Sequence, residues 1–158
     1  MKEIEKKFLL ADGGSIPIPA KFKKFKIKQA YIFADFDKKV RIRISRGKAV
    51  LGVKYTEGVI RDEFEYEIPI KDGKSMFNKS AFKLEKKRLS FKKNKEKYDV
   101  DYYPNNLVVV EVEFKTVELM DKWVKPNWLG EEVTTNSKYS NIVLSKENLK
   151  FAKIKDGE

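Results

Sequence analysis

Charged and apolar residues alternate in several segments of the chain, and the types of charge that repeat there define the available chemistry. Carboxylates repeat at Glu3 and Glu5 and again at Glu111 and Glu113, whereas guanidinium groups repeat at Arg41 and Arg43. Paired carboxylates suit a hard, oxygen-seeking cation such as Mg²⁺ or Mn²⁺. Guanidinium groups suit phosphate oxygens, which they bind in a bidentate fork. These residues therefore predict a site for a metal ion and a phosphate-containing ligand.

Histidine and cysteine are absent from the 158 residues. Their absence excludes imidazole general bases, Ser-His-Asp triads, thiol nucleophiles, disulfides and the usual zinc sites. The formal net charge of +11 predicts an anionic partner. Lysines concentrate at 21–28 and, with arginine, at 83–97, and the ordinary interpretation of such runs is a solvated surface.

Alternation with a period of two residues is typical of half-buried strands, which are the elements that must position these charges. It predicts about eight strands, mostly antiparallel, at Glu3–Leu10, Lys28–Phe33, Lys39–Ser45, Ala49–Tyr55, Ile60–Ile70, Leu84–Phe91, Lys95–Tyr103 and Leu107–Lys115. Helical patterns occupy Lys74–Phe82, Val117–Val124 and Lys138–Ser145. A closed or nearly closed antiparallel sheet with a few helices, in one domain, fits this pattern. Neither a membrane span nor a signal peptide is evident, so we expect a cytoplasmic protein.

The pattern leaves open which strand face is buried. In the first interpretation, the charged faces meet water and the apolar faces form an ordinary core. In the second, the charged faces line a wide barrel, where cations hold a polyanion and carboxylates hold a metal ion. Repeated like charges on one face, as in Glu63, Glu65 and Glu67, favour the second interpretation, because they repel unless something neutralises them.

The ordered series of charged motifs resembles the CYTH domain, or triphosphate tunnel metalloenzyme family, and its short bacterial branch in particular. The first motif, Glu3-Ile4-Glu5-Lys6-Lys7, is similar to the family's Glu-x-Glu-x-Lys. The motifs behind it follow in the family's order and comprise Gln29-Ala30-Tyr31, Val40–Ile44, Val53-Lys54, Arg61–Pro69, Glu85–Arg88, Asp99–Asp101, Val110–Phe114, Trp128–Thr134 and Lys138–Asn141. The resemblance is strongest over 2–145, with 146–158 as a C-terminal extension, and it implies one CYTH-like domain over 1–158. Ala30 stands where the family usually has glycine.

The resemblance implies an α+β fold, mainly antiparallel, with an eight-stranded closed β-barrel that forms a tunnel, a few peripheral helices and a short C-terminal plug helix. It also implies roles for residues of this sequence. Those that would bind the triphosphate are Lys7, Arg41, Arg43, Lys54, Lys86, Arg88 and Lys138. Those that would hold Mg²⁺ or Mn²⁺ are Glu3, Glu5, Glu111 and Glu113, with Glu63, Glu65 and Asp101 as further tunnel acids. Glu5, Lys7 and Tyr31 are the candidate catalytic residues, and Glu5 is the candidate for water activation.

The function that the resemblance favours is metal-dependent hydrolysis of a small-molecule triphosphate, most often inorganic tripolyphosphate. The alternatives are a class IV-type adenylate cyclase, a thiamine or nucleoside triphosphatase, and a non-catalytic polyphosphate-binding module. We expect neither a membrane nor a nucleic acid as partner, and the sequence leaves a homodimer open.

Overall fold

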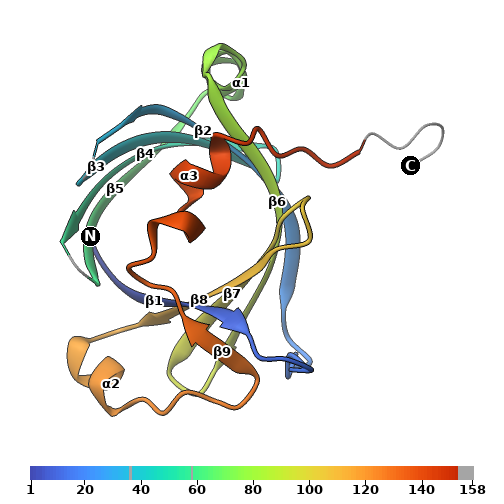
Figure 1. Ribbon diagram of the computed structural model, residues 1–158. Helices are drawn as coiled ribbons and strands as arrows, with labels where there is room; N and C mark the ends of the chain where they lie inside the picture. Colours follow the sequence, from blue (N-terminus) through green and yellow to red (C-terminus); the bar gives the residue numbers. More distant parts are fainter. Residues whose placement is uncertain (36, 58, 153–158) are drawn as a thin grey trace.

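Antiparallel strands form most of the chain, as the computed structural model shows (Figure 1). The structure describes residues 1–35, 37–57 and 59–152. The strands are β1 (Lys2–Leu10), β2 (Lys23–Ala34), β3 (Lys38–Ser45), β4 (Lys48–Glu57), β5 (Ile60–Ile68), β6 (Phe82–Lys93), β7 (Glu96–Tyr102), β8 (Val108–Phe114) and β9 (Leu129–Glu132). The helices are α1 (Ile70–Lys79), α2 (Val117–Lys122), the 3₁₀ turn η1 (Ser137–Tyr139) and α3 (Asn141–Ser145). No helix in these ranges is long and apolar enough to cross a membrane.

The strands close into a barrel. Their order is β5-β4-β3-β2-β6-β7-β8-β1-β9, and a further pairing of β1 with β5 joins the two ends (Figure 1). The N-terminal half of β1 pairs with β5 at Lys2–Asp62, Glu3–Arg61 and Ile4–Ile60. The C-terminal half of β1 pairs with β9 instead. The predicted eight-stranded barrel is therefore confirmed, with β9 as an additional strand beside β1.

Most of the apolar core lies outside the barrel wall. The even-numbered residues of β8 face outward there, and Val110, Val112 and Phe114 are at most 3% exposed. The segment around α2 covers them, with Trp123 packed edge-on against Phe114 at a ring-centroid distance of 5.2 Å. Each buried aliphatic or aromatic side chain contributes roughly 1.5–3 kcal/mol. The apolar side chains of these strands are thus buried by segments outside the barrel, and the charged side chains on the opposite face point into its interior.

Helix α1 covers another part of the outer wall. Its Gly73 lies against β4, where an added Cβ would come 2.3 Å from the Cβ of Ala49. A larger residue at this position would push the helix away from the sheet, so glycine permits the close approach.

The C-terminal segment folds into the barrel and plugs one end (Figure 1). A backbone hydrogen bond from Val133 to the Lys7 carbonyl (2.8 Å) guides the segment along β1. Leu144 of α3 then packs on an apolar layer inside the barrel formed by Leu84, Tyr103 and Val109. The expected plug helix is therefore present, and it rests on an apolar floor.

Several elements differ from the sequence prediction, and β2, for example, begins at Lys23, five residues before the predicted Lys28. Helix α1 begins directly after Pro69, four residues before the predicted start at Lys74, because proline fixes a dihedral angle suited to the position before the first turn. The predicted helix over Lys138–Ser145 is divided by Ser140, which is extended and caps α3 through its side chain. The four-residue β9 was not predicted, since Leu-Gly-Glu-Glu is too short to show alternation.

Candidate active site

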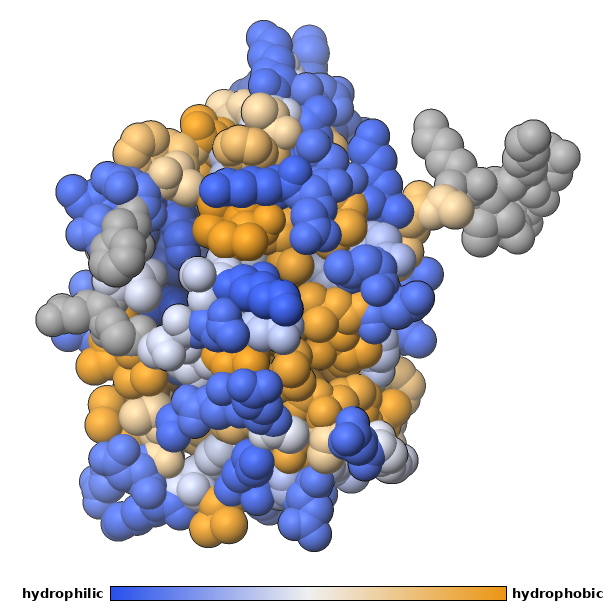
Figure 2. Space-filling view, in the orientation of Figure 1, coloured by the Kyte–Doolittle hydropathy of each residue, from blue (hydrophilic) through white to orange (hydrophobic). Residues whose placement is uncertain are grey.

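The barrel encloses a cavity of about 860 Å³ whose lining is mainly charged. Ten lysine and arginine side chains and eight carboxylates line it within the described ranges. They come from the inward-facing positions of successive strands, which alternate with the outward-facing apolar positions. The second interpretation of the sequence pattern therefore holds for the charged faces. Seen along the barrel, Figure 2 shows hydrophilic side chains over much of the rim.

Strands β1 and β8 bring three glutamates and a lysine together. Glu5 lies opposite Glu113 in the antiparallel register, and Lys7 lies opposite Glu111. Burial and the neighbouring Glu111 raise the pKa of Glu5 to about 7, and burial also raises the pKa of Glu113. Burial would raise the pKa of Glu111 as well, but Lys7 and nearby cations hold that pKa well below its usual value. Burial is therefore the main obstacle to ionising Glu5 and Glu113, whereas nearby cations keep Glu111 ionised.

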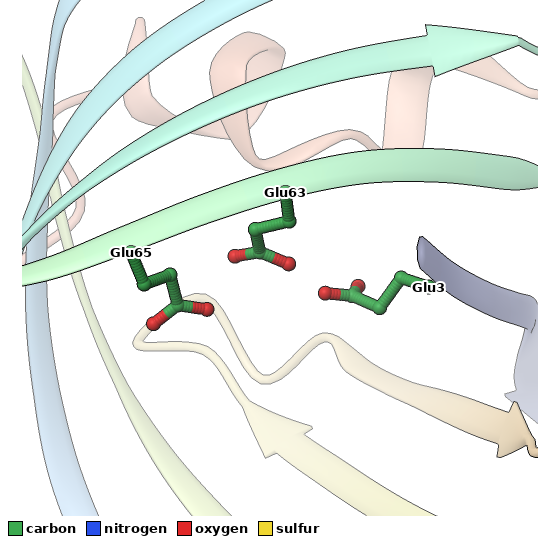
Figure 3. Close-up of side chains that lie close together, drawn as sticks. All are labelled: Glu3, Glu63 and Glu65. Atoms are coloured by element: carbon green, nitrogen blue, oxygen red, sulfur yellow. The ribbon is translucent and has the colours of Figure 1, made fainter. Parts of the chain in front are cut away.

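A second carboxylate group lies where β1 meets β5. Glu3, Glu63 and Glu65 point toward one another (Figure 3), and each has an oxygen within 4.8 Å of the other two. The ammonium of Lys54 lies 3.4 Å from Glu3 and 3.6 Å from Glu63. Arg41 donates a hydrogen bond of 2.9 Å to Glu63. Cations thus hold two of the three carboxylates, while Glu65 is exposed.

Arg61 enters the cavity between the two carboxylate groups. Its Nη1 lies 3.1 Å from Oε1 of Glu5. This nitrogen is buried and makes no hydrogen bond to any described residue. A buried guanidinium with an unsatisfied nitrogen is costly unless a ligand completes its hydrogen bonds.

On the opposite wall, a buried glutamine orients Arg43. The Gln29 side chain is fully buried, and its Oε1 accepts hydrogen bonds from Nε and Nη2 of Arg43 at 3.3 and 3.1 Å. Its Nε2 lies 3.4 Å from the Tyr31 hydroxyl. Burial, together with Arg41 and Arg88, lowers the pKa of Arg43 to about 10. Gln29 therefore fixes the direction of a guanidinium without neutralising it.

Inside the barrel, where Asn141 of the plug separates it from the cavity, Asp101 holds two cations. Lys86 donates to it at 2.8 Å, and Arg88 donates through Nε and Nη2 at 2.7 and 2.9 Å. Lys86 also donates to Asn141 of the plug at 3.2 Å, and Tyr103 donates to the same amide oxygen at 2.5 Å. Lys86 and Asp101 are both fully buried. This ion cluster therefore ties α3 to the barrel and aims Arg88 at the cavity.

The cavity brings together most of the residues that the sequence analysis named. The named residues that line it are Glu3, Glu5, Lys7, Tyr31, Arg41, Arg43, Lys54, Glu63, Glu65, Arg88, Glu111 and Glu113. Lys86 and Asp101 lie in the buried ion cluster beside Asn141 of the plug and are not part of the lining. Lys138 is exposed, with its ammonium 5.6 Å from the centre of the Tyr139 ring, and it does not line the cavity either.

Sequence reasoning assigned no role to several lining residues, among them Arg61, Lys39 and Lys97. The signal was present: Arg61 precedes Glu63 by two residues and Lys39 precedes Arg41 by two, so each shares the inward face of its strand. The family motifs contain neither Lys39 nor Lys97, and the motif that begins at Arg61 implied roles only for its glutamates.

The donor set fits a divalent metal ion. Carboxylate oxygens are the ligands that Mg²⁺ and Mn²⁺ prefer, and the chain offers no imidazole or thiolate to compete. Burial raises the pKa of both Glu5 and Glu113, and a bound divalent cation would offset the cost of burying their charges. Glu3, Glu5, Glu111 and Glu113 are the residues that we would expect to hold it.

Known proteins are similar to this chain in both sequence and fold. The chain is 37% identical to an inorganic triphosphatase of Acetivibrio thermocellus, covering 94% of this chain and 96% of that protein. It is 29% identical to an inorganic triphosphatase of Nitrosomonas europaea, covering 92% and 97%. The crystal structure of the inorganic triphosphatase NE1496 superposes with a TM-score of 0.64 at 25% identity, covering 91% and 94%.

A putative adenylate cyclase from Vibrio parahaemolyticus shares the fold, with a TM-score of 0.54 at 11% identity over 76% of this chain and 80% of that one. No family model matches the chain. The identity of 37% extends over nearly the full length of both proteins, and the chain folds into a closed barrel with a charged interior. Together these findings establish its family. The chain belongs to the CYTH family, the triphosphate tunnel metalloenzymes.

Proposed function

We propose that this protein hydrolyses inorganic tripolyphosphate to diphosphate and orthophosphate inside the barrel. The observation that carries the proposal is the composition of the cavity wall. Among the described residues, eighteen of the thirty that line the cavity are charged, Tyr31 is the one aromatic ring, and the aliphatic side chains are those of Met1, Ala34, Ile142 and Val143. A nucleobase or a thiamine ring needs an aromatic or apolar surface on which to stack. A ligand made only of phosphates needs none, and both relatives named above are inorganic triphosphatases.

The cations that surround the cavity are assigned to the phosphates. Lys7, Arg41, Arg43, Lys54 and Arg88 all reach it, and we add Arg61 because its buried nitrogen lacks a hydrogen bond. In a confined site these charges act far more strongly than they would in water. A triphosphate would also displace the carboxylates that now pair with Arg41 and Lys54. Lys86 and Asp101 act as positioning residues for Arg88, and Lys138 receives no phosphate contact in this proposal.

The carboxylates of β1 and β8 are assigned to the metal ion, which is Mg²⁺ or Mn²⁺. The bound ion would supply charge neutralisation to the phosphate oxygens. Among these residues, Glu5 is the group that we assign to water activation, because its buried carboxylate lies in the cavity wall beside Glu111. In this step water forms a bond to the terminal phosphorus, its proton passes to Glu5, and the bond from that phosphorus to the bridging oxygen breaks.

A substrate panel tests the proposal. Phosphate release is measured from tripolyphosphate, ATP and thiamine triphosphate with Mg²⁺ and with Mn²⁺, and cAMP is measured from ATP. We expect the highest kcat/KM on tripolyphosphate and no cAMP. Formation of cAMP, or metal-free binding of tripolyphosphate without turnover by the folded protein, would overturn the assignment. Glu113→Gln is the matched variant: it keeps the size of the side chain, removes its charge, and should abolish turnover without unfolding the barrel.

A further inference from the structure

The excess of positive charge lies mainly outside the cavity. Ten basic and eight acidic side chains line the cavity, whereas the whole chain carries 35 basic and 24 acidic residues. The tunnel is therefore close to balanced, and the anionic partner predicted by the net charge of +11 is not explained by it. The two lysine-rich runs in the sequence lie on β2 and β6, which are neighbours in the barrel.

Five of these lysines face outward from the wall and form what we call the outer lysine face: Lys24, Lys26, Lys28, Lys83 and Lys87. Residues two apart on a strand lie ~6.7 Å apart on the same face. Lys26 stands directly opposite Lys87 in the register. Like charges directly opposite one another destabilise a sheet. Glu85 lies beside Lys26, so a bound anion would relieve the repulsion chiefly by neutralising Lys87.

Two aromatic rings hold the ammonium groups in place. Lys26 and Lys87 lie over the Phe151 ring at 5.6 and 4.6 Å from its centre. Lys28 and Lys83 lie over the Phe77 ring at 5.8 and 5.6 Å. Cation–π contacts of this kind reduce the side-chain freedom that binding would otherwise cost. Each ring thus presents a pair of preorganised charges to solvent.

Negative charge is scarce on this surface. Glu85 is the one carboxylate that β2 and β6 carry within their described residues, and it lies 2.8 Å from the ammonium of Lys26. Glu85 is 9% exposed, so it screens Lys26 from beneath. The other four lysines of the face have no carboxylate on either strand to pair with.

We propose that the outer lysine face binds linear inorganic polyphosphate, as a second phosphate site separate from the tunnel. The ligand class follows from the rings. Single-stranded nucleic acids are held by bases stacked on free aromatic faces together with cations along the backbone. On this surface lysine ammoniums occupy Phe77 and Phe151, so charge is the chief means of recognition. A polymer with closely spaced phosphates and no bases fits such a surface best.

The test compares binding of end-labelled long-chain polyphosphate by fluorescence anisotropy. The variant Lys26→Gln/Lys28→Gln/Lys83→Gln/Lys87→Gln should bind at least about tenfold more weakly, with a shallower dependence of affinity on salt, since fewer counterions are released. A control with four exposed lysines changed elsewhere, Lys38→Gln/Lys115→Gln/Lys122→Gln/Lys125→Gln, loses the same net charge and should bind nearly as the wild type does.

Equal loss of binding in both variants, or no loss in either, would overturn the proposal. Single-stranded DNA with the same number of phosphates is the second probe. We expect it to bind more weakly than polyphosphate, and equal or tighter binding would make the surface a nucleic-acid site instead. Hydrolysis of tripolyphosphate is measured on the same samples and should not change. A failure of the tunnel assignment would appear only in the hydrolysis assay, and a failure of the outer lysine face would appear only in the binding assay, so the two outcomes can be told apart.

Discussion

Replacing Asp101 by asparagine should destabilise the barrel strongly, although the two side chains have nearly the same shape. The change removes the charge that Lys86 and Arg88 share, with donor distances of 2.7 to 2.9 Å. Lys86 is fully buried, and its one other hydrogen-bond partner in the described structure is the neutral amide of Asn141. The variant therefore leaves the buried Lys86 amine without a charged partner.

The size of the effect follows from the partners that remain. Breaking a buried ion pair costs about 3–5 kcal/mol. Arg88 keeps Asp99 at 3.3 Å and Glu111 at 3.7 Å, so Lys86 accounts for most of the loss. We therefore expect the lower end, about 3 kcal/mol. For a chain of this length that corresponds to a fall in Tm of about 6–12 °C.

The loss should also depend on pH in a defined direction. Burial lowers the pKa of Lys86 to about 7 even with Asp101 beside it, and removing Asp101 lowers it further. Below about pH 7 the wild type keeps the proton that makes the ion pair, and above it the amine becomes neutral in both proteins. The difference in stability should therefore be larger at about pH 6 than at about pH 9.

The assay is urea unfolding at both pH values. Asp121→Asn, which changes an exposed aspartate, serves as the control. Lys86→Met combined with Asp101→Asn removes both charges and should recover part of the loss. A loss below about 1 kcal/mol for Asp101→Asn, or a larger loss at high pH, would refute the assignment of Asp101 as the counterion of Lys86.

Three further predictions concern the site and the packing around it. Arg43→Ala should lower kcat/KM for tripolyphosphate by roughly 10²–10³-fold. Lys138→Ala alters an exposed side chain outside the cavity and should change kcat/KM little. Similar losses of kcat/KM for the two variants in steady-state assays would contradict the different placement of the two residues. Below the Glu5 pKa of about 7, a metal ion must displace the proton that Glu5 holds. The Mg²⁺ concentration for half-maximal rate should therefore rise as pH falls through neutrality and level off above it. If this concentration is the same from acid to alkaline pH, Glu5 is not a ligand. Thr116→Ala removes the side chain that caps α2 by accepting from the Leu119 N–H at 3.1 Å, and it should cost about 1 kcal/mol in thermal unfolding; Thr135→Ala, at an exposed position away from that helix, is the comparison.

The strands could be predicted from the sequence because alternation reports directly on two unlike faces. The pattern in Val110-Glu111-Val112-Glu113 located β8 and separated its charged side from its apolar side. It could not say which side faces inward. That depends on whether other segments cover the apolar side, and Trp123 and Trp128, which do so, lie beyond the strand in the sequence. The resemblance to a known family supplied the answer that local pattern could not.

The distinction between cavity wall and buried support was also beyond the sequence. Lys86 and Arg88 share the inward face of β6, and both match family motifs. Their different positions arise because Asn141 of the plug approaches Lys86 and seals it from the cavity. A contact between residues 55 positions apart leaves no local trace in the sequence. Lys138 shows the opposite case, since a motif match placed it in the site but the turn η1 directs it to solvent.

The position of β1 has a consequence for how the chain acquires its structure. This strand is the first of the nine to leave the ribosome, yet its neighbours β5, β8 and β9 begin at residues 60, 108 and 129. Pairings so distant along the chain slow folding, because long loops must close before any contact rewards them. The pairing of β1 with β5 therefore requires residues 60–68 to have been synthesised, and the pairing with β8, which brings Glu5 opposite Glu113, must wait for residues 108–114.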